Sequence, residues 1–427
     1  MEGLLNSAQC VAKAVSFWKN PYAWLLDKRL SRGYWVFFSA AFFFDAGFAV
    51  YFFLFNLYLL DCGFNERSMG WIGGAMTLGS LAATLPVGAL GRRIGVRPLL
   101  IILFISAPLT NAVRAIWVWE PAQIAFAFLT GVAMSSWGVC FLPAVARLTN
   151  ERNRTSGFSL IFSVSVGTSM LGGIVCGYLG KWLGLAGFMI QPLAVKRLIL
   201  LAACVIALVG LFPVLRLHVP SQQDAFITEH GHRKWLKAGK SNPFLIRFLL
   251  CMALWSGILA AFTPFANVYL TKDLHISMTK IGLIFSSVQV VQLCMGLLAP
   301  VLFRALGLVN GIAITQISAG IVLVLLSKAA NERVAIVLYL IYSAAQWMSS
   351  PGLYNLLMSK TPDEDRSNAA AATMFCNSLV ASLATAGAGI LFARFGYSPV
   401  LMLLGAGALL IALLFHSLIS PLQNGAD

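Results

Sequence analysis

One acidic residue lies deep within a long apolar segment, where its carboxylate could take up and release a proton. Asp45 stands about eleven residues into the segment 34–58, among several phenylalanines. If this segment spans a bilayer, a charged carboxylate there costs on the order of 2.5–3.5 kcal/mol, so such residues are usually retained for function. Desolvation favours the protonated form. Two roles remain open for Asp45: proton uptake linked to a conformational change, and a structural hydrogen bond to a neighbouring serine or backbone group.

Polar and aromatic side chains share faces of three apolar segments, because residues three or four apart lie on one side of a helix. In the segment 34–58 this face carries Asp45, Ala49, Phe52 and Asn56. In 244–270 it carries Ser256, Ala260, Thr263 and Asn267. In 333–357 it carries Tyr339, Tyr342, Gln346 and Ser350. Trp255 and Trp347 lie beside these faces, where they either stack on a bound molecule or pack against helices and lipid. With few charges among them, these groups favour a neutral, weakly basic or amphipathic ligand.

The elements that hold these side chains are long apolar segments. The chain is 59% hydrophobic and 11% charged, with a mean hydropathy of +0.83, which leaves too little polar surface for a soluble globule. A helix spans a bilayer with roughly 20 apolar residues. Twelve stretches fit this length: 34–58, 69–91, 98–118, 122–146, 157–181, 197–217, 244–270, 279–303, 309–329, 333–357, 369–392 and 397–420. Because segments such as LIILFISAPL are apolar on every face, we expect an all-α membrane protein rather than a barrel.

Landmarks in the first half recur 212 residues later. The pairs are Gly70 and Gly282, Arg92 and Arg304, Gly95 and Gly307, Glu151 and Asp363, Arg154 and Arg366, and Gly184 and Gly396. A constant offset of about half the chain indicates two pseudo-symmetric six-helix bundles, a build typical of transporters. The expected domains are an interfacial or disordered arm at 1–33, a bundle at 34–217, a linker at 218–243, a second bundle at 244–420 and a tail at 421–427.

The basic residues predict the orientation, because Lys and Arg are retained on the cytoplasmic side. With the N-terminus inside, that side holds 20 of the 30 Lys and Arg residues, so both termini should be cytoplasmic. The formal charge of +15 then reflects membrane topology rather than nucleic-acid binding. Arg114, near the opposite end of its segment, is expected to reach the interface or to meet Asp61, Glu66 or Glu120. Short loops favour a prokaryotic cytoplasmic (inner) membrane.

Several other functions lack their sequence signals. The five histidines stand at 218, 230, 232, 275 and 416, without the cluster that an enzyme or a metal site needs. No Gly-x-x-x-x-Gly-Lys phosphate-binding loop is present, which argues against an ATP-driven pump. We therefore expect no enzyme activity, no cofactor and no metal.

The loop after the second apolar segment carries the most specific motif. It reads GALGRRIGVR and keeps Gly88, Arg93, Gly95 and Arg97 of the pattern Gly, three residues, Asp, Arg, one residue, Gly, then basic residues. Arg92 replaces the aspartate, and the second copy, APVLFRALGL, retains Arg304 and Gly307. With its twelve stretches, the chain resembles the major facilitator superfamily (MFS). The resemblance implies that helices 1, 7 and 10 line a central cavity. The expected substrate and proton site comprises Asp45, Phe52, Asn56, Trp255, Thr263, Asn267, Tyr339, Tyr342 and Gln346.

The same resemblance places helix 2 against helix 11 and helix 8 against helix 5. We therefore expect a cytoplasmic gate of two ion pairs, Arg92 with Asp363 or Asp365 and Arg304 with Glu151. Carboxylates also suit the starts of helices 5 and 11, where the helix dipole favours negative charge. The alternative is that these are solvated loop charges that contribute little. The gate residues are Arg92, Arg93, Gly95, Glu151, Arg304, Asp363 and Asp365.

These observations predict a monomeric secondary transporter that moves a small solute by alternating access, coupled to protons through the helix-1 carboxylate. Two alternatives stay open: a drug or amphiphile exporter of the same fold, and a uniporter or transporter-like sensor without ion coupling. The family's drug–proton antiporters carry a Gly-Pro signature in helix 5, whereas this chain reads SMLGG there. Its partners would be the solute, protons and the lipid bilayer.

Overall fold

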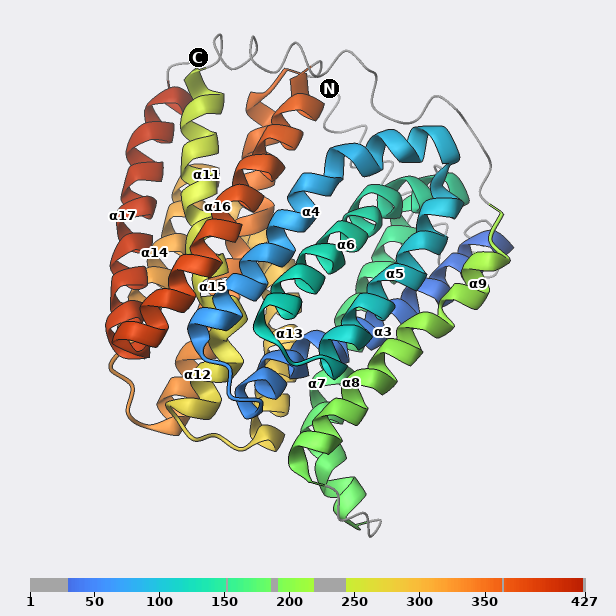
Figure 1. Cartoon of the computed structure of the whole chain (residues 1–427). Coiled ribbons are helices and arrows are strands. Elements are labelled where there is room, and N and C mark those ends of the chain that lie inside the picture. The colour runs from blue at the N-terminus through green and yellow to red at the C-terminus, as the bar shows by residue number, and fades with distance from the viewer. Residues whose placement is uncertain (1–29, 151–152, 186–190, 219–242, 363–364, 425–427) are drawn as a thin grey trace, which may run out of the picture.

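Twelve long helical segments make up the described part of the chain (Figure 1). The computed structural model describes residues 30–150, 153–185, 191–218, 243–362 and 365–424. The segments of the first half are α3 (Arg32–Asp61), α4 (Glu66–Ile94), α5 (Val96–Ile116), α6 (Glu120–Leu148), α7 (Arg154–Leu185) and α8 (Pro192–Val209) with α9 (Leu211–Leu215). Those of the second half are α11 (Pro243–Phe262) with η1 (Thr263–Phe265) and α12 (Ala266–Lys272), α13 (Met278–Leu306), α14 (Leu308–Leu326), α15 (Glu332–Lys360), α16 (Arg366–Phe395) and α17 (Tyr397–Asn424). The all-α membrane architecture is thus confirmed.

Eleven of these segments are long and apolar enough to cross a membrane. The twelfth, α15, has the length but falls below that apolar level over the described residues. Its sequence explains why, since Ser343, Gln346, Ser349 and Ser350 interrupt the apolar run. A spanning helix with this many polar groups needs protein or a water-filled cavity beside it, because lipid cannot satisfy them. The polar α15 is therefore a first indication of a functional interior.

The two six-helix halves pack mostly within themselves. In the first half α3 contacts α7 and α8, and α4 and α5 contact α6. In the second half α14 contacts α15 and α17, α11 contacts α16, and α13 contacts α15. Two strong contacts cross between the halves, α4 with α16 and α7 with α13, and the first of them runs through the centre of Figure 1. These are the expected helix 2–helix 11 and helix 8–helix 5 neighbours.

The repeated landmarks have a local structural cause at two positions. Gly95 joins α4 to α5 with φ +88°, and Gly307 joins α13 to α14 with φ +79°. Glycine occupies this left-handed region without the steric cost that a Cβ brings. Each glycine thereby lets the chain leave one long helix and start the next immediately. The 212-residue repeat is therefore visible in the backbone as well as in the sequence.

The expected domain limits meet the structure only in part. Most of the N-terminal arm, nearly all of the linker and the last three residues lie outside the described residues. Ser31 caps α3, because its side chain accepts a hydrogen bond from the backbone N–H of Tyr34. At the other end α17 continues to Asn424.

Candidate functional site

The helix directions define two sides of the molecule. We call the side at which α3 begins the near side and the side at which it ends the far side. Because successive helices alternate in direction, the connections 61–66, 116–120, 272–278, 326–332 and 395–397 lie on the far side. The contacts between the halves described below all involve far-side portions of their helices. We refer to them together as the far-side seal.

Glycines let the helices of the two halves approach closely at two crossings. A Cβ added at Gly70 of α4 would lie 2.9 Å from the Gly389 Cα of α16. A Cβ added at Gly282 of α13 would lie 3.0 Å from the Gly177 Cα of α7. Both partners obey the repeat, since 70 and 282, like 177 and 389, are 212 apart. Small residues at such crossings allow close packing of membrane helices.

A serine hydrogen bond accompanies each glycine crossing, one turn along. The Ser382 hydroxyl of α16 donates to the Gly74 carbonyl of α4 at 2.7 Å. The Ser286 hydroxyl of α13 donates to the Met170 carbonyl of α7 at 2.6 Å. Positions 74 and 286 correspond by the repeat, as do 170 and 382. The two bonds therefore occupy equivalent places, although the donor belongs to opposite members of the two helix pairs.

Two asparagines join helix 1 to helix 7 reciprocally, and we call this pair of bonds the asparagine clasp. The Asn56 amide of α3 donates to the Pro264 carbonyl at 2.6 Å, and the Asn267 amide of α12 donates to the Phe53 carbonyl at 3.0 Å. Each asparagine thus binds the carbonyl of the residue that stands three positions before the other asparagine. Both had been expected at the substrate site, and here their amides hold the halves together. Their role toward a substrate stays a prediction.

One ion pair strengthens only the α4 side of the far-side seal. Lys272, at the end of α12, lies 2.7 Å from the Glu66 carboxylate at the start of α4. The Glu66 side chain is only 2% exposed, whereas that of Lys272 is 51% exposed. The residue that corresponds to Glu66 in the second copy is Met278, the first residue of α13. The charged contact is therefore not duplicated.

Asp45 is half-buried on α3 and accepts a hydrogen bond from the Ser165 hydroxyl of α7. The same helix α7 carries Met170 and Gly177, which belong to the seal with α13. A change in the charge of Asp45 would therefore act directly on a helix that also crosses between the halves. This contact with Ser165 is compatible with either role of Asp45, and the choice between the two roles stays a prediction.

A cluster of polar atoms in the second half lacks hydrogen-bond partners among the described residues. Its members are Trp255 Nε1 on α11, Tyr342 Oη and Gln346 Oε1 on α15, and Asn377 Oδ1 on α16. Their three helices contact one another, and the Ser256 hydroxyl donates to the Asn377 carbonyl at 3.3 Å. Buried polar atoms are usually paired, so unpaired ones need an explanation such as a ligand or water. We call these four residues the polar cluster.

Aromatic and hydroxyl groups lie around Tyr342, one member of the polar cluster. Tyr339 and Tyr342 present ring edges to Phe262, with centroids 6.1 and 5.6 Å apart, and Thr263 lies beside Tyr342. Phe52 of the first half is 38% exposed and packs against Phe48. The structure thus brings Thr263, Tyr339 and Tyr342 together beside Phe262.

Asn377 was not among the residues predicted from the sequence. A signal was present, since Asn377 is the one amide side chain in the stretch 369–392.

Three of the seven residues expected at the cytoplasmic gate cannot be placed. Glu151 and Asp363, and the side chain of Arg92, lie outside the described residues. Arg93 is exposed next to Gly95, and the Arg304 Nε donates to the Pro300 carbonyl of its own helix at 3.2 Å. Asp365 stands at the N-cap of α16. The two gate ion pairs therefore stay predictions.

Arg114 corrects one expectation. Its side chain neither reaches the interface nor pairs with Asp61, Glu66 or Glu120, because the residue is only 2% exposed. Its Nη1 donates to the Asn111 Oδ1 at 3.2 Å, and its guanidinium lies 4.2 Å from the centroid of the Phe55 ring. A neutral amide and an aromatic face replace the carboxylate that we had expected.

Comparison with known proteins now decides the family. The profile of the Major Facilitator Superfamily matches residues 37–385, most of the chain. The chain belongs to the Major Facilitator Superfamily. No curated protein sequence matches it. Family and fold make this superfamily member a transporter rather than an enzyme.

Solved structures share the superfamily fold. The nucleoside transporter NupG has 14% sequence identity and a TM-score of 0.77, covering 91% of this chain and 99% of that one. A D-xylose–proton symporter has 17% identity and a TM-score of 0.69, with coverage of 89% and 95%. A bacterial homologue of the iron transporter ferroportin, in its inward-facing state, has 18% identity and a TM-score of 0.68, with coverage of 91% and 99%. At these identities the likeness concerns the fold alone.

Proposed function

We propose that this transporter is a secondary carrier that moves a small, neutral, polar solute by alternating access. The observation that carries the proposal is the polar cluster, whose buried atoms lack hydrogen-bond partners among the described residues. A solute that supplies those partners would gain affinity without bringing a charge into the bilayer. The far-side seal supports alternating access, because it holds the two halves of the protein closed against each other on one side.

The far-side seal is built from contacts that can be broken and remade. A hydrogen bond contributes a net of about 0.5–1.5 kcal/mol, so the asparagine clasp and the two serine bonds cost little enough to open in a transport cycle. The glycine crossings involve no long side chains that would need to withdraw. Opening of this side, together with closure of the near side, would expose the polar cluster alternately to the two compartments.

The chemistry of the polar cluster favours neutral solutes with several hydrogen-bonding groups. Trp255 and Tyr342 offer donors, and Gln346 and Asn377 offer carbonyl oxygens. None of the four carries a formal charge. Two solved members of the fold are named for nucleosides and for D-xylose, which are neutral solutes of this kind. We therefore place nucleoside-like and sugar-like solutes ahead of amphipathic drugs.

Proton coupling through Asp45 forms the finer part of the proposal. Protonation of Asp45 on α3 removes the charge that the Ser165 hydroxyl of α7 contacts. Helix α7 also contacts α13 within the far-side seal. Uptake of a proton would therefore change a contact on a helix that must move. A uniporter without ion coupling is the alternative, in which Asp45 and Ser165 only tie α3 to α7.

Orientation and assembly complete the proposal. The near side faces the cytoplasm in this proposal, because the topology predicted from the sequence assigns 20 of the 30 Lys and Arg residues to that side and basic residues are retained there. The far-side seal then closes the outer face of a cytoplasmic membrane, which we propose to be prokaryotic. One chain supplies both halves of the pathway, so a monomer suffices.

Counterflow in proteoliposomes tests the solute class. We expect vesicles preloaded with the correct nucleoside or sugar to accumulate its labelled form, and Gln346→Leu to raise the half-saturating concentration about tenfold, the effect of about 1.4 kcal/mol. Gln316→Leu is the matched control, because Gln316 also has an unpaired buried Oε1 but lies on α14. Counterflow of amphipathic cations alone would support the exporter alternative. Equal effects of both substitutions would remove the polar cluster from the binding site.

A further inference from the structure

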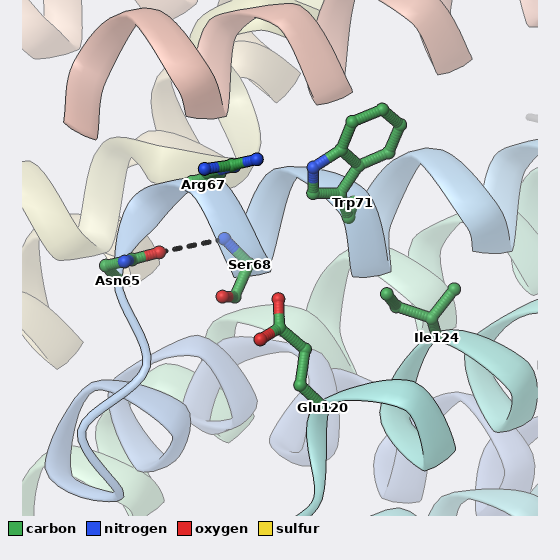
Figure 2. A pocket seen from close by; sticks show the side chains of 6 residues that line it. All are labelled: Asn65, Arg67, Ser68, Trp71, Glu120 and Ile124. Carbon is green, nitrogen blue, oxygen red and sulfur yellow. Dashed lines mark hydrogen bonds between the residues drawn. The ribbon is translucent and has the colours of Figure 1, made fainter. Parts of the chain in front are cut away.

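A notch opens on the far side between the starts of α4 and α6, away from the polar cluster. Its volume is about 420 Å³, and Figure 2 shows its six lining residues, Asn65, Arg67, Ser68, Trp71, Glu120 and Ile124. Arg67 and Trp71 project from one turn of α4, and Glu120 projects from the start of α6 below them. The notch plays no part in the transport cycle proposed above.

Opposite charges line the notch without neutralising each other. Within the described part of the chain, neither Arg67 nor Glu120 has an ion-pair partner within 4.0 Å. Ser68 is only 7% exposed, yet its hydroxyl has no hydrogen-bond partner there. The Asn65 oxygen is already engaged, because it accepts from the Ser68 backbone N–H at 3.0 Å. The notch thus offers a cation, an anion and the Ser68 hydroxyl to one occupant.

Aromatic residues place the notch at the level of the lipid headgroups. Trp71, Trp117 and Trp119 are 44%, 53% and 56% exposed, and all three lie at this end of the first half. Exposed tryptophans gather where the bilayer meets water. Ile124 continues the lining with an apolar side chain. The lining thus changes from charged residues to an apolar one, which matches an occupant with a charged head and an apolar body.

We propose that the notch binds the headgroup of a zwitterionic phospholipid with a primary ammonium. Arg67 would bind the phosphate, because a guanidinium donates several hydrogen bonds to phosphate oxygens. Glu120 would accept from the ammonium, and the Ser68 hydroxyl would accept a second N–H. A quaternary ammonium has no N–H to give them, and a purely anionic headgroup leaves Glu120 without a counter-charge. The acyl chains would follow the apolar edge at Ile124.

Native mass spectrometry of the full-length protein tests the site. The delipidated protein would be offered equal amounts of phosphatidylethanolamine, phosphatidylcholine and phosphatidylglycerol, and the retained lipid counted. We expect phosphatidylethanolamine to be preferred. We expect Arg67→Gln to reduce its retention about three- to fivefold, the upper part of the range of exposed charge pairs. Glu120→Gln should retain an amount of total phospholipid closer to that of wild type than Arg67→Gln does. It should nevertheless remove the preference for ethanolamine over choline headgroups.

The chain provides a matched control for Arg67. Helix α15 begins with the same triplet, Asn331-Glu332-Arg333, and Asn331 caps it as Asn65 caps α4. Arg333→Gln therefore removes an exposed arginine from an equivalent helix start on the same side without touching the notch. Equal retention in Arg67→Gln, Arg333→Gln and wild type would overturn the proposal. Preferred retention of phosphatidylglycerol, or full displacement by soluble phosphoethanolamine at equal concentration, would overturn it as well.

Discussion

The α4–α16 and α7–α13 crossings have the same design but different charges. Each brings two glycines together, and each adds one serine hydrogen bond a turn away. Only the α4 crossing has an ion pair beside it, because Glu66 starts α4 whereas Met278 starts α13. Close helix approach is therefore the duplicated, general feature of the far-side seal. The Glu66–Lys272 pair is an addition to one copy.

Filling a glycine crossing should have the largest effect. In Gly282→Val the new side chain would meet the α7 backbone, since a Cβ there already lies 3.0 Å from the Gly177 Cα. Overpacking of this kind costs about 1–3 kcal/mol, so we expect the seal to open and the transport rate to fall about tenfold or more. Hydrogen–deuterium exchange at 272–278 would report the opening.

Gly167→Val provides the control on α7, because a Cβ at Gly167 meets nothing within 4 Å. The comparison also predicts that Gly70→Val resembles Gly282→Val. A severe defect at one crossing and none at the other would contradict the idea that both crossings carry the closed state.

Removal of one asparagine should have an intermediate effect. Asn56→Ala and Asn267→Ala each delete one bond of the asparagine clasp, which we expect to weaken the far-side closed state by about 1 kcal/mol. Because the bonds are reciprocal, the two variants should raise far-side exchange to a similar extent. Thr271→Val is the control, since the Thr271 hydroxyl bonds only within its own helix. If one of the two asparagine variants behaved like the control, only one bond of the asparagine clasp would stabilise the closed state.

Loss of the ion pair should have the smallest effect. Lys272→Gln removes the partner of the buried Glu66, but water screens the half-exposed lysine, so we expect a shift of about 1 kcal/mol or less toward the open far side. The shift should shrink at high salt. Lys280→Gln breaks an exposed pair with Glu332 inside the second half and serves as the control. If both variants behaved alike, the Glu66–Lys272 pair would have no special role between the halves.

The helices and the repeat could be predicted because they depend on local sequence. Apolar runs of sufficient length identify spanning helices, and the glycines at 95 and 307 occur where the backbone requires φ above zero. The role of Gly70 and Gly282 could not be read in the same way. Gly70 meets Gly389 and Gly282 meets Gly177, each in the other half of the chain, and only the packed structure pairs them.

The site residues show the same limit. Sequence spacing places Tyr342 and Gln346 on one face, but it does not tell which polar atoms find partners. Asn56 and Asn267 lie on the predicted faces and nevertheless bind backbone carbonyls of the opposite half. Arg114 was expected to reach the interface or to meet an acidic residue, whereas in the structure its side chain contacts Asn111 and Phe55. Tertiary contacts decided each of these cases.

The central claim, a carrier whose solute movement is linked to protonation of Asp45, has one direct test. Intravesicular pH would be followed in proteoliposomes that contain wild type, Asp45→Asn or the control Glu332→Gln, during challenge with a panel of nucleosides, sugars, amino acids and organic cations. We predict a solute-dependent proton flux in wild type and the control, and its loss in Asp45→Asn with counterflow retained. An unchanged proton flux in Asp45→Asn, or counterflow without proton flux in wild type, would contradict the claim.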